Sequence, residues 1–142
     1  MNLRAHRVAT AAFARVEARQ TLAGKPRKQY GAIAHKLPGM ILQNGLAQAT
    51  GFLLAKGANA EDDHHSWLLD DLNAVLRAGG SLDVPDRQAL HARIIQADLN
   101  QTLKLTRDAL EASGWLKRYV QGLLRISATG DNATETDPQQ KD

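Results

Sequence analysis

The amino-acid sequence predicts an all-α protein, a compact bundle of about five or six helices. Apolar residues make up 43% of the chain and are mostly Ala and Leu, which favour helix. Only six residues are aromatic, and no stretch shows the β-branched enrichment that is typical of strands. A chain of 142 residues is long enough to bury one sizeable core, so we expect a single domain.

The first two predicted helices cover residues 3–23 and about 27–36, separated by the break Gly24-Lys25-Pro26. In the first helix, apolar residues recur at helical spacing along one face. A stripe of cations follows one flank of that face: Arg4, Arg7, Arg15 and Arg19. The second helix is expected to end at Leu37-Pro38-Gly39, because proline disfavours the α conformation in the residue before it.

A third helix is expected over residues 38–56, where an apolar stripe has a clear helical period. The stripe consists of Leu42, Leu46, Ala49 and Leu53. Asn44-Gly45 alone would suggest a turn, but the stripe continues through it. The pattern therefore predicts an unbroken helix in which Gly45 permits close contact with a neighbour, at a cost of about 1 kcal/mol relative to Ala.

The fourth predicted helix opens at Glu61-Asp62-Asp63, whose charges suit the positive end of a helix dipole, and stops at Gly79-Gly80-Ser81. Asp83 is expected to cap the next helix, with Pro85 in its first turn. The following apolar residues have helical spacing and indicate one long helix or two: Leu90, Ile94, Leu99, Leu103, Thr106 and Leu110.

The last helical segment continues through Gly114, which marks a kink or a join, and the helical domain is predicted to span residues 1–126. Residues 127–142 are polar and without periodicity, so we expect a disordered tail. No run of eighteen apolar residues exists, so no membrane span is expected. Because the start of the chain lacks a secretory signal and cysteine is absent, the cytoplasm fits best.

Charge is distributed very unevenly along the chain. Residues 1–56 carry nine Lys or Arg and one acid, a net charge of +8, whereas residues 57–142 carry nine Lys or Arg and fourteen acids, a net charge of −5. A field of one sign attracts polyanions and speeds their capture, which makes nucleic acid the leading candidate partner. The alternative is that the two halves neutralise one another, within one fold or between stacked copies.

No arrangement of residues points to catalysis, so we expect neither an enzyme nor a cofactor. His64-His65 beside three acids is the most tempting metal site, but adjacent helical side chains point about 100° apart, which favours a polar helix start instead. Asp70-Asp71 fails as an acid–base pair because neighbouring helical residues do not face each other. The spacings of a phosphate loop, a zinc-protease helix and a nucleophile elbow are also missing.

The basic residues are better candidates for a binding site. Lys25, Arg27 and Lys28 crowd the predicted break between two helices, where three cations in four residues repel unless something offsets them. Lys36 and Lys56 fall at predicted helix C-termini, where phosphate contact and pairing with the helix dipole are equally open. The candidate nucleic-acid-binding residues are Arg15, Arg19, Lys25, Arg27, Lys28, Lys36, Lys56, Lys117 and Arg118.

Three aromatic residues lie among these cations. Tyr30 could stack on a base, but as the only large aromatic residue of its helix it is better interpreted as a core anchor. Trp115 and Tyr119 lie one turn apart and are expected to pack together. Lys117 and Arg118 are then expected to project from the far side of that helix.

Residues 30–56 also carry an ordered set of residues typical of a known family. The set is Tyr30, Lys36-Leu37-Pro38, Ile41, Asn44-Gly45-Leu46, Phe52 and Lys56. It resembles the small subunit of type III-B (Cmr) CRISPR effector complexes, and Trp115-Leu116-Lys117-Arg118 resembles the C-terminal helix of that family. The resemblance spans residues 3–126 but is dense only over 30–56, and around 64–98 it extends only to helical character.

This resemblance implies a small all-α protein with no catalytic activity of its own. Several copies would stack head to tail beside the backbone subunits and line the groove where guide RNA pairs with target RNA. The target-cleaving acids would belong to a backbone subunit, and cyclase or DNase activity to the large subunit. The implied function is RNA binding in antiviral defence, with guide RNA, target RNA, the backbone and large subunits and neighbouring copies as partners.

Two alternatives of other classes stay open. A helix-turn-helix DNA-binding regulator would need polar base-reading residues at the start of a recognition helix, whereas the helix predicted after Pro38 offers only Gln43-Asn44. A scaffold that never touches nucleic acid would use the charge asymmetry for subunit pairing alone. Salt-dependent binding to RNA of arbitrary sequence would separate the RNA-binding subunit from both.

Overall fold

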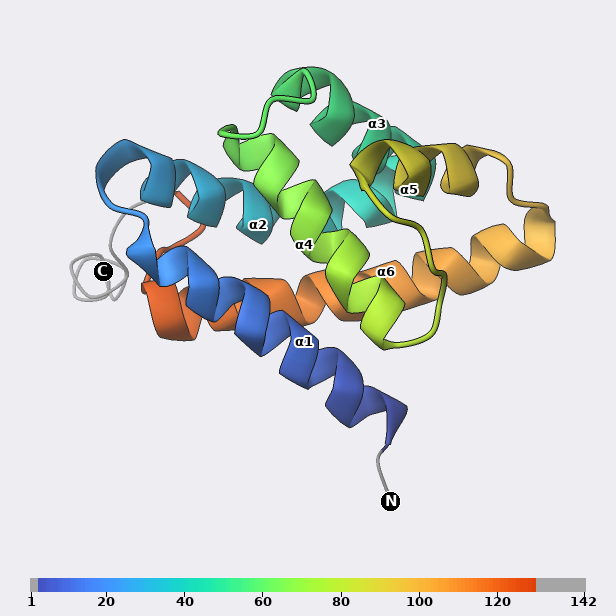
Figure 1. Ribbon diagram of the computed structural model, residues 1–142, viewed down its shortest axis with the longest axis horizontal. Helices are drawn as coiled ribbons and strands as arrows, with labels where there is room; N and C mark the ends of the chain where they lie inside the picture. Colours follow the sequence, from blue (N-terminus) through green and yellow to red (C-terminus); the bar gives the residue numbers. More distant parts are fainter. Residues whose placement is uncertain (1–2, 130–142) are drawn as a thin grey trace.

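Helix α4 (His64–Ala78) crosses the middle of the molecule and contacts each of the other five α-helices of the described chain (Figure 1). In this computed structural model, which describes residues 3–129, α4 supplies the centre of the core. Its inward face is apolar and fully buried: Leu68, Leu69, Leu72, Val75 and Leu76. This spacing of three and four residues is the amphipathic pattern of a helix that buries one face.

The other helices pack around α4. Helix α1 (Arg4–Ala18) lies against α4 and α6, α2 (Gly24–Asn44) against α6 and α4, and α3 (Leu46–Gly57) against α4 and α5. Helix α5 (Arg87–Ile95) is short, and α6 (Leu99–Tyr119) is long and continues into a π-helical turn, Val120–Leu124. A 3₁₀ turn, Arg19–Thr21, follows α1. The prediction of an all-α bundle of five or six helices is confirmed for residues 3–129.

The predicted boundary between the second and third helices is wrong. Helix α2 runs through Pro38 to Asn44, because Leu37 and Ile41 keep burying the same face and offset the cost of an internal proline. The chain breaks instead at Gly45, whose φ of +88° lies outside the helical region and favours glycine. The local turn signal of Asn44-Gly45 was therefore the correct one, and Leu42, predicted to be core, is 71% exposed.

Three aspartates begin helices, and two of them differ from the predicted start. Asp63 caps α4, so the helix begins at His64 and not at Glu61. Asp86, and not Asp83, caps α5 by accepting a hydrogen bond from the Ala89 N–H at 2.8 Å. Pro85 consequently precedes the cap. Asp98 forms a reciprocal capping box with Gln101, which separates α5 from α6 and settles the choice between one helix and two.

The first residues of α6 stand apart from the core. Residues 99–104 are all exposed, and the buried face of the helix begins at Leu105. Leu99 and Leu103, which the sequence places on an apolar face, are 73% and 62% exposed. Gly114 lies inside α6 without interrupting it.

The structure also bears on the ends of the chain and on membrane insertion. Of the tail predicted over residues 127–142, positions 130–142 lie outside the described residues. Between residues 3 and 129, no helix is both long enough and apolar enough to cross a bilayer.

Candidate nucleic-acid interface

The C-terminal arginines of the α1 stripe are turned toward the core. Arg15 Nε donates to Asp71 Oδ1 at 2.7 Å. Arg19 donates to both carboxylate oxygens of Asp71, from Nε to Oδ2 at 3.0 Å and from Nη2 to Oδ1 at 2.8 Å. Asp71 is fully buried and also accepts a hydrogen bond from the hydroxyl of Tyr30. Tyr30 is itself fully buried, so its interpretation as a core anchor is confirmed. Burial, together with the Asp71 carboxylate, holds the pKa of Tyr30 well above its usual range.

The N-terminal arginines of the same stripe hold the end of α4. Arg4 Nε donates to the Gly79 carbonyl at 3.1 Å, and Arg7 Nε donates to the Ala78 carbonyl at 3.3 Å. Cations suit this end of a helix because its last carbonyls carry partial negative charge. Arg4 also pairs with Glu111 and Asp108 of α6, at 2.6 and 3.3 Å. Part of the positive charge of the N-terminal half is therefore neutralised inside one chain.

Arg27, a third predicted binding residue, joins segments that are distant in sequence. Its Nη1 donates to the carbonyls of Gln20 and Leu22, at 3.0 and 3.1 Å. Its Nη2 donates to the carbonyl of Leu124 at 3.0 Å. The guanidinium thus ties the start of α2 to the π-helical turn near the C-terminus. RNA contact by Arg15, Arg19 and Arg27 stays a prediction, and each of them has a structural role in the free chain.

Lys25 lies in the first turn of α2 and Lys28 directly after that turn, so neither lies in a break between helices. Both side chains are exposed, and neither has a hydrogen-bond or ion-pair partner among residues 3–129. No acid lies in this turn, and Ala23 at the cap position provides no side-chain acceptor for the first N–H groups. Lysines and uncapped N–H groups therefore share the positive end of a 21-residue helix.

Lys36 and Lys56 were both predicted to lie at helix C-termini, and the structure places only Lys56 there. Lys36 is exposed in the middle of α2, because that helix continues to Asn44, so its predicted position at a helix C-terminus is wrong. The alternative of pairing with the helix dipole therefore does not apply to Lys36. Lys56 does lie in the last turn of α3, with Nζ 6.0 Å from the centre of the Phe52 ring. For Lys56, interaction with the helix dipole and contact with phosphate are both still open.

At the end of α6, Trp115 and Tyr119 stack with their ring centres 5.6 Å apart, and Tyr119 meets Phe13 of α1 edge to face at 5.4 Å. The predicted packing of this pair is confirmed. Arg118 does not project from the far side as expected, because its guanidinium lies 5.3 Å from the Trp115 ring centre. The i, i+3 spacing on a helix places these two side chains together. Lys117 is half-buried near His35, whose pKa it helps to lower.

The candidate metal site at His64-His65 lies at the start of α4, and its potential ligand atoms lie close together. Asp63 Oδ1 accepts hydrogen bonds from the His65 N–H at 2.7 Å and from His65 Nδ1 at 2.8 Å. The predicted divergence of the two imidazoles is wrong, since the ring centres of His64 and His65 lie only 4.0 Å apart. At the first helical position no preceding turn restricts the side chain. One ligand atom from each of the three residues lies within 4.8 Å of the others.

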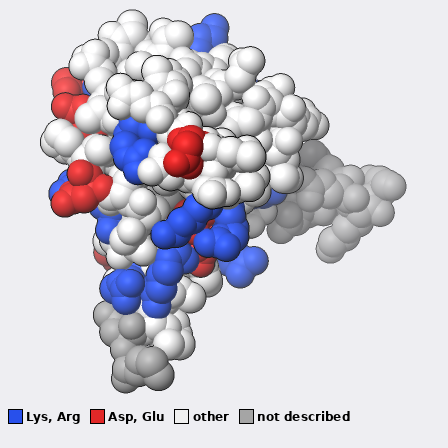
Figure 2. Space-filling view, turned by 90° about the vertical axis from the view of Figure 1, so that its right-hand side faces the viewer, with Lys and Arg blue, Asp and Glu red and all other residues white. Residues whose placement is uncertain are grey.

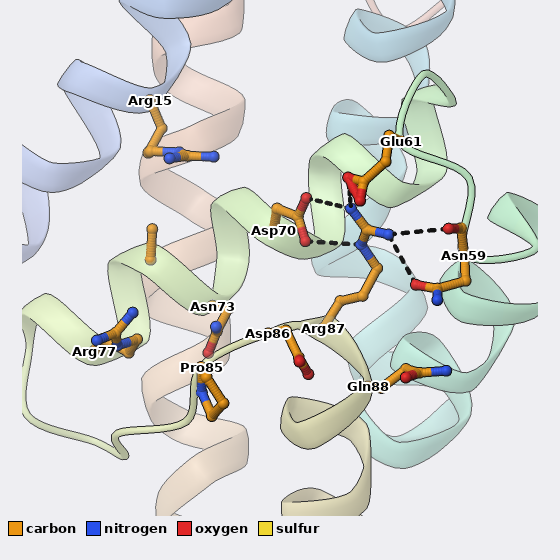
Figure 3. Close-up of a pocket in the computed structure, with 11 residues that line it drawn as sticks. Arg15, Asn59, Glu61, Asp70, Asn73, Arg77, Pro85, Asp86, Arg87 and Gln88 are labelled. Atoms are coloured by element: carbon orange, nitrogen blue, oxygen red, sulfur yellow. Dashed lines mark hydrogen bonds and ion pairs between the residues drawn. The ribbon is translucent and has the colours of Figure 1, made fainter.

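An ionic cluster that the sequence did not predict surrounds the buried side chain of Arg87 (Figure 3). Arg87 is 6% exposed and donates to both carboxylate oxygens of Asp70, at 2.8 and 2.7 Å. It also donates to Glu61 at 3.1 Å and to Asn59 Oδ1 at 2.8 Å, along the wall of a pocket of about 410 Å³. The hydrogen bond with Asp70 outweighs the effect of burial and raises the pKa of Arg87. Asp70 and Asp71 therefore serve different arginines on different sides of α4.

The sequence of this chain is similar to that of a known protein family. A family model described as CRISPR-associated protein (Cas_Cmr5) matches residues 4–123. The chain belongs to the Cmr5 family. It is 36% identical over 106 residues to the CRISPR system Cmr subunit Cmr5 of Thermus thermophilus, covering 75% of this chain and 84% of that protein. The resemblance found in residues 30–56 is thereby confirmed.

The Cmr5 fold is shared as well. A crystal structure of a CRISPR-associated Cmr5 family protein from Thermus thermophilus superposes with a TM-score of 0.73 at 32% identity. The match covers 87% of this chain and 99% of the solved one. The helical bundle described above is therefore the Cmr5 fold.

Proposed function

We propose that this chain is a non-catalytic, RNA-binding small subunit of a CRISPR Cmr effector complex. The observation that supports this most is the start of α2, where exposed Lys25 and Lys28 have no acid to offset them. A positive side chain at the positive end of a helix dipole destabilises the helix by about 0.3–1 kcal/mol when nothing offsets it. A phosphate at this position would relieve that cost and accept hydrogen bonds from the uncapped N–H groups.

One further lysine extends this basic surface along α2. Lys36 is exposed further along α2 and, among residues 3–129, has no hydrogen-bond or ion-pair partner. Lysines bind phosphate as point charges, so the proposed contact reads the backbone and not the base sequence. Since Tyr30 is buried, base stacking on this helix is not part of the proposal. Recognition by charge and shape suits a guide–target duplex whose sequence varies.

The proposed assembly is a head-to-tail stack of several copies in the cytoplasm, beside the backbone and large subunits. The internal ion pairs of Arg4, Arg15 and Arg19 reduce the charge available for stacking. Copies are therefore expected to align only where a backbone filament and RNA add further contacts. A heterologous contact of this kind forms an open filament and not a closed dimer.

The test is a charge reversal restricted to exposed lysines. In Lys25→Glu/Lys28→Glu/Lys36→Glu the helical circular dichroism should be unchanged, while affinity for RNA and assembly on guide–target duplex fall. The effect should weaken as salt rises, because each phosphate contact contributes about 0.7–0.9 to the salt slope. Arg27 is kept, because its removal would release the start of α2 and confuse unfolding with lost contact.

Two outcomes of this test would contradict the proposal. Normal RNA binding by the triple variant would show that the lysines are only a solvated helix start. Unchanged RNA binding with failed assembly would favour the protein-only scaffold. Independently, purified chain with Mg²⁺ or Mn²⁺ should leave RNA and DNA intact, and nuclease activity abolished by His64→Ala would overturn the non-catalytic assignment.

A further inference from the structure

A second group of cations lies where α1, the loop after α4 and α6 meet. These cations line a groove of about 440 Å³, together with the backbone of Gly79 and Gly80: Arg4, Lys104 and Arg107. Figure 2 shows Lys and Arg side chains gathered on the lower half of one face of the molecule. Lys104 and Arg107 were not among the candidates from the sequence.

The acids of the groove are already satisfied by the protein. Asp108 is only 4% exposed and accepts a hydrogen bond from Ser81 Oγ at 2.8 Å in addition to its ion pair with Arg4. Glu111 takes the short hydrogen bond from Arg4 Nη1 at 2.6 Å. Arg4 is thus a counterion of both acids within the chain.

Lys104 and Arg107 are left with donors directed to solvent. Lys104 is exposed and has no hydrogen-bond or ion-pair partner among residues 3–129. Arg107 has a side chain that is 76% exposed, and its one ion pair within the described chain, from Nε to Asp108, is long at 3.7 Å. Because the two residues are three apart on α6, their charges lie on the same face of the helix and repel each other.

The lining of the groove indicates the class of ligand. It contains no large apolar side chain, whereas a protein interface buries an apolar centre. Flexible cations over a polar floor are instead typical of contacts with phosphates of a nucleic-acid backbone. Two of the elements that border the groove, the start of α1 and the end of α4, lie toward the opposite end of the molecule from the start of α2 (Figure 1).

We propose that Lys104 and Arg107 form a second phosphate-binding site for the RNA strand. This inference rests on the proposed function, since it assigns a further part of the same strand to the same chain. The head-to-tail stack proposed above would place cation groups of neighbouring copies along one strand. The strand then passes from the α6 groove of one copy to the α2 start of the next.

The test compares two variants with the same net charge. Lys104→Gln/Arg107→Gln removes both contacts and lowers the formal charge by two. Gln43→Glu/Gln48→Glu lowers it equally at two exposed positions outside either cation group. Full-length protein is titrated into fluorescently labelled single-stranded RNA of mixed sequence between about 50 and 200 mM salt. Urea denaturation confirms that each variant is folded.

Loss of both contacts should flatten the salt slope by about 1.4, whereas the glutamine-to-glutamate variant should keep the wild-type slope. Equal effects of the two variants would overturn the inference, because only the overall charge would matter. Wild-type RNA binding by Lys104→Gln/Arg107→Gln with failed entry into the complex would also overturn it, in favour of an acidic protein partner. If wild-type protein binds no RNA at low salt, the proposed function fails as well.

Discussion

The guanidinium of Arg19 spans both carboxylate oxygens of Asp71, at 3.0 and 2.8 Å, although the two residues lie 52 positions apart in the sequence. Asp71 has no solvent exposure, and Arg19 also packs between the rings of Tyr30 and Trp67, 5.5 Å from each centre. This pair fixes α1 to α4 at the point where the predicted basic surface begins. Asp71, which also pairs with Arg15, thus makes Arg15 and Arg19 less available to a ligand.

We predict that Asp71→Asn strongly destabilises the fold. The substitution leaves the Arg19 guanidinium buried without its counterion, and breaking one partner of a buried pair typically costs about 3–5 kcal/mol. The free energy of unfolding in urea measures this loss. Asp83→Asn is the matched control, because Asp83 pairs with Arg77 in solvent with 88% of its side chain exposed. Equal stability of the two variants would contradict the structural role of Asp71.

Opposite effects are expected for alanine at two glycines of α2. A Cβ on Gly31 would collide with the side chain of Ile126, so Gly31→Ala should cost about 1–3 kcal/mol by overpacking. A Cβ on Gly39 meets nothing within 4 Å, and Gly39→Ala should stabilise the helix by about 1 kcal/mol. Thermal unfolding of both variants checks this difference in sign. Stabilisation by both would show that residue 126 does not pack on α2.

Stability should fall as the pH drops below about 6.5, the ordinary pKa of histidine. His35 is 7% exposed and donates from Nε2 to the Ile126 carbonyl at 2.8 Å, while Nδ1 has no partner among residues 3–129. Burial lowers the pKa of His35 below its usual value, and the hydrogen bond to Ile126 offsets only part of that effect. The unfolded chain then binds more protons than the folded one, so acidification favours unfolding.

Urea unfolding of wild type and His35→Gln at several values between pH 7.5 and about 5.5 measures this dependence. The variant should lose part of the slope. His64, whose pKa burial and His65 also lower, supplies a second contribution that His64→Gln should remove separately. An unchanged slope in His35→Gln would show that its environment does not disfavour the charged form.

The isolated chain should sediment mainly as a 15.5 kDa species at micromolar concentration and moderate salt. Exposed ion pairs contribute only about 0–1 kcal/mol each, and they do not offset the entropy of association by themselves. Analytical ultracentrifugation measures the distribution. A tight dimer that persists at high salt would contradict the open-stack proposal and favour the two-fold helix-turn-helix regulator.

Local sequence patterns predicted part of the buried face of the first helix, but they did not predict where the second helix ends. Spacing alone placed five residues of the first predicted helix near one face: Ala5, Val8, Ala12, Val16 and Ala23. The middle three are buried, whereas Ala5 and Ala23 are exposed. The choice between Pro38 and Gly45 as the break could not be made in this way, because each carries a local signal for interruption. Packing decides it, since Leu37 and Ile41 lie on one continuous buried face of α2.

The candidate site was predictable only in part. The sequence located the exposed Lys25, Lys28 and Lys36, but nothing in it distinguishes them from Arg27, which is tied to the Leu124 carbonyl 97 residues away. The sequence also did not point to Lys104 as a binding residue. The same limit applies to Arg87, whose carboxylate partners lie 17 and 26 positions away.

The sequence by itself determined that the chain is helical, that it carries an excess of cations at the front, and that its residues 30–56 follow the pattern of the Cmr5 family. These properties are local, because helix periodicity and charge are set by neighbours within a few positions. Only the tertiary structure decided which cations face water. Arg19 became part of the core because α4 places Asp71 against it, whereas no acid of the described chain reaches Lys25.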